Sequence, residues 1–161
     1  MERLWTPWRM EYIKDPGRED VCIFCEIPKR EDDDAGLILA RGSLAFVILN
    51  KYPYNTGHLM IVPFRHVGEW ESMSADEHAE IAELTGRAME ALKASSAPHG
   101  FNLGVNQGRV AGAGVVDHVH MHVVPRWGGD TNFTFTVGGV KVLPEALDDT
   151  YAKLKPHFAG R

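Results

Sequence analysis

The sequence predicts an α+β fold with an antiparallel meander sheet, and three observations lead to this fold class. Short segments rich in Val, Ile and Leu follow one another with only brief turns between them. One long amphipathic helix interrupts these segments, and a weaker helix closes the chain. Strands joined by short turns favour antiparallel pairing over an alternating strand–helix array. The 161 residues suit a single domain, 1–161, with an N-terminal arm (1–20), a core (22–127) and a C-terminal extension (128–161).

The first half of the chain contains three expected strands. Their residues are mostly branched and apolar, and Gly42, the turn at 52–55 and Pro63 punctuate them. An acidic run at 31–34 precedes them and is interpreted as a solvated loop, with cation binding as the alternative. The three strands are Gly36–Ala40, Leu44–Leu49 and His58–Val62.

The strongest helix signal begins at Ser74, where Ser-Ala-Asp-Glu forms a capping box. Apolar residues then recur at helical spacing and predict one buried stripe. Pro98 and Gly100 are expected to end this helix. The stripe consists of Ile81, Leu84, Ala88, Met89 and Leu92.

The second half of the chain is expected to return to the sheet. Phe101–Asn106 is interpreted as a strand, Gln107–Val116 as a glycine-rich loop, and 118–124 as a strand that carries histidines. A weaker helix is predicted over 144–158, with Pro144 at its first turn.

Composition narrows the classes of function. The hydrophobic fraction of 44% and the charged fraction of 24% are ordinary for a soluble globular protein. A net charge of −5 argues against a nucleic-acid polymer as partner, although a small anionic ligand needs only local donors. No stretch approaches the roughly 20 apolar residues of a membrane span, so a cytoplasmic protein is expected. Both cysteines lie in 22–25, which leaves no disulfide framework.

Three histidines alternate with apolar residues at His118, His120 and His122. In an extended strand they share one face, and a buried strand rarely takes three polar rings in this pattern. Alternate residues lie about 6.6 Å apart, so three rings converging on one ion would be strained. The spacing therefore favours a division of roles, with one histidine for a metal and two for a substrate.

The Cys22-x-x-Cys25 spacing is that of a zinc knuckle. The chain offers His66 and His118 as two further ligands. Four protein ligands would saturate a zinc ion and make the site structural. Two alternatives remain open from the spacing alone: a pair of reduced structural cysteines, and a redox pair.

The glycine-rich loop that leads into the histidines is a candidate anion cradle, because glycines let backbone N–H groups approach a phosphate. A phosphate held there lies within reach of an imidazole nitrogen. A neutral imidazole whose other nitrogen donates to a backbone carbonyl can attack phosphorus and form a labile phosphoramidate. His120, the middle histidine, is the expected nucleophile.

The residues 118–124, followed by Pro125-Arg126, resemble the signature of the histidine triad (HIT) superfamily. The segments 22–25, 49–58 and 62–66 also occur in the order and spacing of that superfamily, so the resemblance covers roughly 20–127. Further stretches are similar to the bacterial branch of diadenosine-tetraphosphate phosphorylases and hydrolases, namely 3–7, 52–55, 98–102 and 125–130.

This resemblance implies a HIT-like fold, a homodimer whose sheet continues across the interface, and cleavage of dinucleoside polyphosphates without an organic cofactor. It implies that His120 is the nucleophile and that His122 contacts the phosphates. Zinc would be bound by Cys22, Cys25, His66 and His118. The implied substrate-binding residues are Asn50 at the ribose, Asn106 and Gln107 near the phosphate chain, and the loop residues Gly112, Ala113, Gly114 and Val115.

One departure from the family concerns Ala113-Gly114-Val115, where many members carry Gly-Gln-Ser or Gly-Gln-Thr. The small residue at 114 leaves room for an extra anion, so inorganic phosphate is a candidate second acceptor. Two alternative functions remain: a purine nucleoside phosphoramidase, and a nucleotide-binding regulatory protein with incidental hydrolysis.

The remaining histidines and tryptophans are expected to be structural. His58 is interpreted as packed under the pocket, and Asp117 as a solvated or capping carboxylate. Surface positions are expected for His78, His99 and His157. A dimer surface or stacking on a base is expected for Trp5, Trp8 and Trp127.

Overall fold

A computed structural model describes residues 21–131 and 142–159 of the protein. The expected N-terminal arm with Trp5 and Trp8 lies outside the described residues, as does 132–141 within the expected C-terminal extension.

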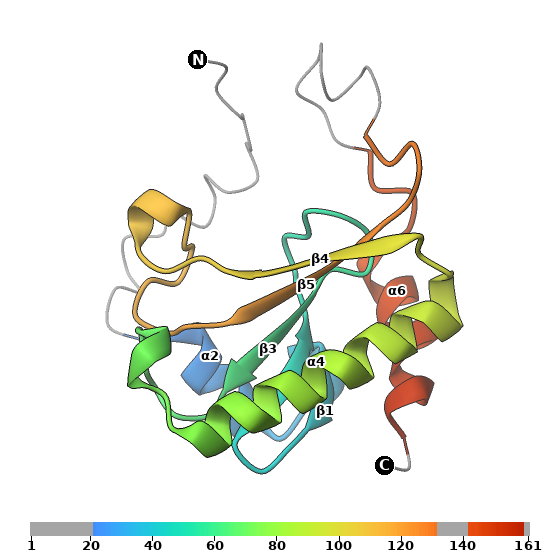
Figure 1. The fold of residues 1–161 in the computed structure, drawn as a ribbon. Coiled ribbons are helices and arrows are strands. Elements are labelled where there is room, and N and C mark those ends of the chain that lie inside the picture. The colour runs from blue at the N-terminus through green and yellow to red at the C-terminus, as the bar shows by residue number, and fades with distance from the viewer. Residues whose placement is uncertain (1–20, 132–141, 160–161) are drawn as a thin grey trace.

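Within the described residues, five strands form one antiparallel sheet in the order β1-β2-β3-β5-β4, which confirms the α+β class (Figure 1). The sheet is not a simple meander, because β5 lies between β3 and β4. The helix α4 (Ala75–Ser96) connects β3 to β4, and β5 then pairs with both of them. The strands are β1 (Ile38–Arg41), β2 (Ala45–Leu49), β3 (Leu59–Pro63), β4 (Gly100–Val105) and β5 (Met121–Arg126).

The long helix α4 begins with the expected capping box. The Ser74 backbone N–H donates to the Glu77 carboxylate at 2.7 Å, and the Ser74 hydroxyl accepts from the Glu77 backbone N–H at 3.2 Å. The helix ends where Ala97 adopts a left-handed conformation with φ of 44°. The predicted stripe is confirmed at four positions, whereas Met89 is only partly buried. The buried members are Ile81, Leu84, Ala88 and Leu92.

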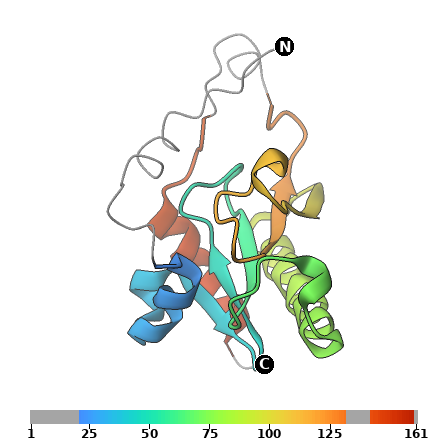
Figure 2. The same ribbon diagram turned by 90° about the vertical axis from the view of Figure 1, so that its left-hand side faces the viewer.

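The two faces of the sheet have different coverings, as Figure 2 shows. In β2, Ala45 and Val47 belong to the cluster that packs against α4. The alternate residues Phe46 and Ile48 belong to a smaller cluster on the opposite face, together with Phe24 of α2 (Ile23–Glu26). This second face carries the candidate site.

The acidic run is largely exposed, as the sequence predicts, but part of it forms a helical turn rather than a loop. Asp32 caps the short helix α3 (Asp33–Gly36), because its Oδ1 accepts from the Ala35 backbone N–H at 3.0 Å. Asp33 accepts from the Arg41 guanidinium at 2.9 Å. The carboxylates therefore organise a helical turn, and β1 starts at Ile38 rather than at Gly36.

The C-terminal helix α6 (Leu147–Leu154) begins three residues after Pro144, and the turn η4 (Lys155–Phe158) follows it. The Tyr151 hydroxyl bonds to the Ile38 carbonyl at 2.8 Å and to Asp34 at 2.9 Å, which ties the helix to β1. Three further short turns are η1 (Ile27–Arg30), η2 (Trp70–Ser72) and η3 (Arg109–Ala111).

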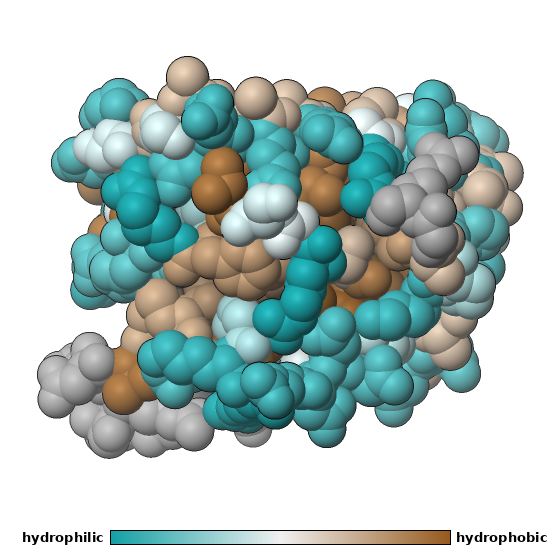
Figure 3. Space-filling model, turned by 90° about the horizontal axis from the view of Figure 1, so that it is seen from below, coloured by the Kyte–Doolittle hydropathy of each residue, from teal (hydrophilic) through white to brown (hydrophobic). Residues whose placement is uncertain are grey.

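Among the described helices, none combines the length and the apolar character that crossing a membrane requires. Seen from below, the surface shows hydrophilic residues around a smaller hydrophobic area (Figure 3).

Candidate active site and metal cluster

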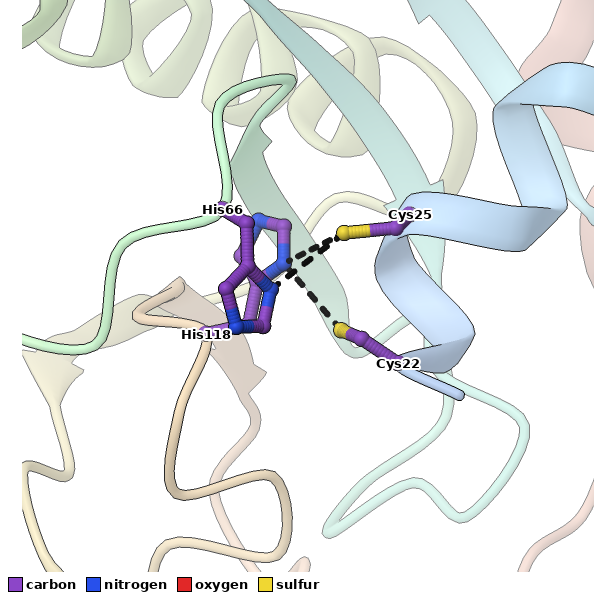
Figure 4. A group of neighbouring side chains, drawn as sticks. All are labelled: Cys22, Cys25, His66 and His118. Atoms are coloured by element: carbon purple, nitrogen blue, oxygen red, sulfur yellow. Dashed lines mark hydrogen bonds between the residues drawn. The ribbon is translucent and has the colours of Figure 1, made fainter. Parts of the chain in front are cut away.

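The four predicted metal ligands lie together, although three separate segments supply them (Figure 4). Cys22 and Cys25 belong to the first turn of α2, His66 follows β3, and His118 precedes β5. Their ligand atoms all lie within 4.8 Å of one another. The His118 Nδ1 is 3.2 Å from the Cys22 Sγ and 3.5 Å from the Cys25 Sγ. The His66 Nδ1 is 3.3 Å from the Cys25 Sγ.

The ring of His118 is oriented for this role. Its Nε2 lies 2.8 Å from the Pro63 carbonyl oxygen and donates to it, so that Nδ1 presents its lone pair to the sulfurs. The ring is fully buried, and this burial lowers the pKa of His118 and favours the neutral form that binds metals. Burial, followed by the contact with Cys22, raises the pKa of the Cys25 thiol. A cation at this point would favour both thiolates.

The separations fit one four-coordinate ion. Metal–sulfur distances near 2.3 Å and metal–nitrogen distances near 2.1 Å require sulfur-to-nitrogen edges of about 3.6 Å in a tetrahedron. Three of the sulfur-to-nitrogen distances in the cluster are 3.2, 3.3 and 3.5 Å. Two thiolates and two imidazoles would fill all four positions, so the cluster can hold a metal ion but leaves no position for a substrate.

The histidine segment departs from the predicted strand over 118–124. The strand β5 begins only at Met121, because Val119 donates its backbone N–H to the Val67 carbonyl at 2.7 Å instead of joining the sheet. The three rings therefore separate. His118 faces the cysteines, whereas His120 and His122 lie against each other, with ring centroids 4.8 Å apart. This placement agrees with the predicted division of roles.

His120 has a defined protonation pattern. Its Nδ1 lies 2.9 Å from the His118 carbonyl oxygen, so Nδ1 carries the proton and Nε2 keeps its lone pair. The side chain is 5% exposed, and desolvation lowers the pKa of His120 and favours the neutral ring. The ring also contacts Phe24 at 5.0 Å between centroids. These are the features that a nitrogen nucleophile needs.

A chain of hydrogen bonds, the relay, runs from Tyr54 through His58 to His122 and favours the opposite tautomer in His122. The Tyr54 backbone N–H donates to the His58 Nδ1 at 3.0 Å, so a neutral His58 carries its proton on Nε2. That nitrogen is 2.9 Å from the His122 Nδ1 and donates to it. His122 then carries its own proton on Nε2. The relay thus presents an N–H donor beside the lone pair of His120.

A cavity of about 370 Å³ opens beside these two rings. His120 and His122 line one end of it, next to Gly114 and Val115, and Asn50 lines it as well. The rest of the wall combines apolar and aromatic side chains, as in small-molecule sites with a few placed polar groups. These wall residues include Ile23, Phe24, Ile27, Tyr52 and Tyr54.

The predicted substrate-binding residues separate into two groups. Asn50, Gly114 and Val115 line the cavity, and the Asn106 amide lies 3.5 Å from the His122 Nε2. Gln107 is directed elsewhere, since it accepts from the Trp70 backbone N–H at 2.8 Å and donates to Glu71 at 3.0 Å. Gly112 and Ala113 are not among the residues that line the cavity.

The histidines expected to be structural also have identified positions. His58 is fully buried beneath the cavity, as predicted, but its role in orienting His122 was not foreseen. His78 packs on Trp70, and His99 accepts from the Gly128 backbone N–H at 2.9 Å. His157 lies exposed in η4.

Two residues of the site were not predicted from the sequence. Phe24 and Tyr54 contact the catalytic candidates, and Tyr54 also supplies the N–H that starts the relay. In the sequence, Tyr54 belongs to the Tyr-Pro-Tyr-Asn turn, which also carries part of the family resemblance, but neither observation indicates which residues Tyr54 contacts. Phe24 lies between the two cysteines, and an aromatic residue at such a position is normally predicted to be part of the hydrophobic core.

Comparison with known proteins gives three consistent results. The HIT domain family matches residues 33–129. A protein of Mycobacterium tuberculosis named AP-4-A phosphorylase is 46% identical over 167 residues, which cover 99% of this chain and 85% of the relative. An adenosine 5'-monophosphoramidase of Schizosaccharomyces pombe is 32% identical over 65% of this chain and 74% of its own length.

Solved structures agree on the fold. A histidine triad nucleotide-binding protein from Sulfolobus tokodaii aligns with a TM-score of 0.67 at 30% identity, covering 85% of this chain and 89% of the other. A zinc-bound histidine triad family protein from Mycobacterium smegmatis aligns with a TM-score of 0.69 at 24% identity, covering 86% and 93%.

Proposed function

The chain belongs to the HIT domain family, and from this premise we propose that it cleaves dinucleoside polyphosphates, diadenosine tetraphosphate in particular, through a nucleotide bound covalently to His120. One observation carries the proposal: two adjacent imidazoles line the end of the cavity, and the hydrogen-bond partners of their Nδ1 atoms favour opposite tautomers. The AP-4-A phosphorylase name of a 46% identical relative supports the choice of substrate.

The first step uses the lone pair of the His120 Nε2. It attacks the α-phosphorus, a nitrogen–phosphorus bond forms, and the bond from that phosphorus to the bridging oxygen breaks. The hydrogen bond from Nδ1 to the His118 carbonyl stabilises the positive charge that develops on the ring. The leaving group from diadenosine tetraphosphate is ATP.

His122 supports the same step from the other side. Its Nε2 proton, set by the relay through His58, can donate to a phosphate oxygen as negative charge develops there. The low exposure of both rings, 5% and 7%, strengthens this interaction by excluding water. Removing His122 should therefore slow the step without removing the nucleophile.

The cavity suits the nucleoside part of the substrate. The apolar wall around Phe24 and Ile27 would contact the base, and Asn50 would face the ribose hydroxyls. Gly114 and Val115 would lie along the phosphates, with Asn106 beside His122. From their positions, Gln107, Gly112 and Ala113 would shape the loop and make no direct contact in this state.

The second acceptor is proposed to be inorganic phosphate. A side-chain carbon added at Gly114 would meet no atom within 4 Å, so this part of the cavity wall is open. Phosphate entering there would attack the phosphorus on the face opposite His120, release the ring nitrogen and yield ADP. Water in the same place would yield AMP.

Product analysis tests this proposal. Diadenosine tetraphosphate is incubated with the enzyme at increasing phosphate, and nucleotides are separated by ion-exchange chromatography. Equal amounts of ADP and ATP, with a rate that rises with phosphate, are expected. A rate indifferent to phosphate, with AMP and ATP as products, would contradict phosphorolysis. Faster cleavage of an adenosine phosphoramidate would favour the phosphoramidase instead.

We infer that the cluster of Cys22, Cys25, His66 and His118 binds a structural zinc ion. When bound, zinc would cross-link α2 to the segment after β3 and to the segment before β5, and would neutralise two thiolates. Elemental analysis of the purified protein should find one zinc per chain.

We also infer a homodimer in which two β4 strands pair. Strand β4 is at the end of the sheet, and Asn102, Leu103 and Gly104 are exposed there. An exposed edge of this kind is a template for strand pairing. Light scattering that finds a monomer at micromolar concentration would contradict this inference.

A further inference from the structure

The loop between β2 and β3 (50–58) carries the start of the histidine relay, and one buried side chain anchors it. Asn55 is 5% exposed. Its Nδ2 donates to the Pro125 carbonyl at 2.9 Å and to the Asp130 carboxylate at 2.8 Å. Its backbone carbonyl accepts from the His58 N–H at 3.1 Å. Asn55 therefore ties the loop to the end of β5 on one side and to His58 on the other.

Asp130 is itself held firmly. The Arg126 guanidinium makes two hydrogen bonds to its carboxylate, at 2.6 and 2.8 Å, and the Trp127 backbone N–H adds a third at 3.2 Å. The Asp130 side chain is 8% exposed. Paired, doubly hydrogen-bonded geometry of this kind fixes the position of an acceptor more tightly than a single contact does. The carboxylate is thus a fixed point for Asn55.

Asn55 follows the residue whose backbone N–H sets the tautomers of His58 and His122. Tyr54 immediately precedes Asn55, and its backbone N–H is the donor to the His58 Nδ1. The Asn50 Nδ2 is a second, longer contact of the same nitrogen, at 3.3 Å. Loss of the Tyr54 donor would remove the shorter of these two contacts, so the proton would be held less firmly on the His58 Nε2 and the donor to the His122 Nδ1 would be weaker.

We propose that Asn55, held by Asp130, is a positioning residue that fixes the tautomer of His122 through the Tyr54 N–H and His58. The side chain does not touch the substrate in this scheme. It acts by keeping one backbone N–H aimed at one ring nitrogen. The effect on catalysis rests on the proposed function, whereas the effect on the tautomer does not.

The test reads the tautomer directly. The enzyme is labelled with ¹⁵N-histidine, and the ring nitrogens of His122, assigned with a His122→Gln variant, are recorded without substrate. In the wild type, Nε2 should carry the proton. In Asn55→Ala, both nitrogens should shift toward the average of two tautomers. Turnover should fall about 10- to 100-fold, with KM little changed. Thr131→Val is the matched control, since it removes a different hydrogen bond to the same carboxylate and should leave the signals unchanged.

An Asn55→Ala protein that folds and keeps the His122 proton on Nε2 would overturn the proposal, whatever its activity. If Asn55→Ala does not fold, Asn55→Ser leaves a smaller void and is judged by the same nitrogen signals. Because these spectra contain no substrate, a wrong substrate assignment leaves this result unaffected. Failure of the proposed function would appear in the product analysis alone.

Discussion

The metal cluster and the histidine relay use neighbouring residues of one segment for opposite purposes. In the cluster, His118 directs its lone pair inward at two sulfurs, and four ligands would close the site. Beside the cavity, His120 presents a lone pair, and His122, at the end of the relay, presents a proton. Two backbone carbonyl acceptors and one imidazole donor decide the difference, since each ring is oriented by the partner of its other nitrogen. The comparison predicts that one region controls stability and the other controls turnover.

The largest effect should come from His120→Ala. Removing the nucleophile should reduce turnover by about 10³-fold or more, because no neighbouring group can form the covalent intermediate. The melting temperature should change little. Steady-state assays and thermal unfolding measure the two quantities, with His157→Ala, an exposed histidine in η4, as the control. Turnover that persists near the wild-type rate would remove His120 from the role given to it.

The second-largest effect should come from a substitution in the metal cluster, and it should be an effect on stability. Cys25→Ser should lose zinc and about 4 kcal/mol of unfolding free energy, the stabilisation expected from a ligand at 1,000 times its dissociation constant. Denaturant unfolding with and without a chelator measures it. Turnover per folded molecule should fall much less, although the His118 carbonyl links the cluster to His120. A variant with unchanged stability and no turnover would place the cluster within the active site.

The same two regions differ in how far the sequence could predict them. The four candidate metal ligands were identifiable because sulfur and imidazole side chains have few other reasons to occur in such spacing. The division between His118 and the other two histidines also followed from strand geometry. The start of β5 at Met121 did not, because it depends on the bond from Val119 to the Val67 carbonyl.

The relay from Tyr54 through His58 to His122 could not be predicted from the sequence, for a different reason. It is initiated by a backbone N–H of Tyr54, and every residue has one, so residue type carries no signal. Gln107 shows the converse case. Its family position predicts a phosphate contact, yet its amide bonds to Trp70 and Glu71 across a tertiary contact that no local pattern encodes. In the same way, the order β3-β5-β4 depends on long-range pairing.

A third prediction concerns the salt bridge next to His66, one of the residues of the metal cluster. Arg65 precedes His66 and forms a salt bridge of 2.7 Å with Glu77 of the α4 capping box. The hydrogen bond from Arg65 lowers the pKa of Glu77 to about 2 from an ordinary value of 4.5. Since the folded-state pKa is depressed, the stabilisation is complete above pH 4.5 and is lost as pH falls toward 2. Glu77→Gln should cost about 2 kcal/mol at neutral pH, less than the shift alone implies because Arg65 is half exposed.

Unfolding free energies measured between pH 2.5 and 7 would test this prediction. The wild-type protein should lose more stability over this range than Glu77→Gln does. Glu83→Gln, an exposed change on the same helix, should follow the wild type. Parallel curves for all three proteins would show that the pair does not brace the segment carrying His66.

The smallest effect should come from the loop beside the relay. The Thr56 hydroxyl oxygen is buried, and no hydrogen-bond partner for it exists among the described residues. Thr56→Val should therefore raise the unfolding free energy by up to about 1 kcal/mol and leave turnover unchanged. Thr85→Val is the matched control, because its buried hydroxyl donates to the Ile81 carbonyl at 2.7 Å and its loss should destabilise the protein. If Thr56→Val destabilises as much as Thr85→Val, the Thr56 hydroxyl bonds to a group outside the described residues, and the loop has a second anchor besides Asn55.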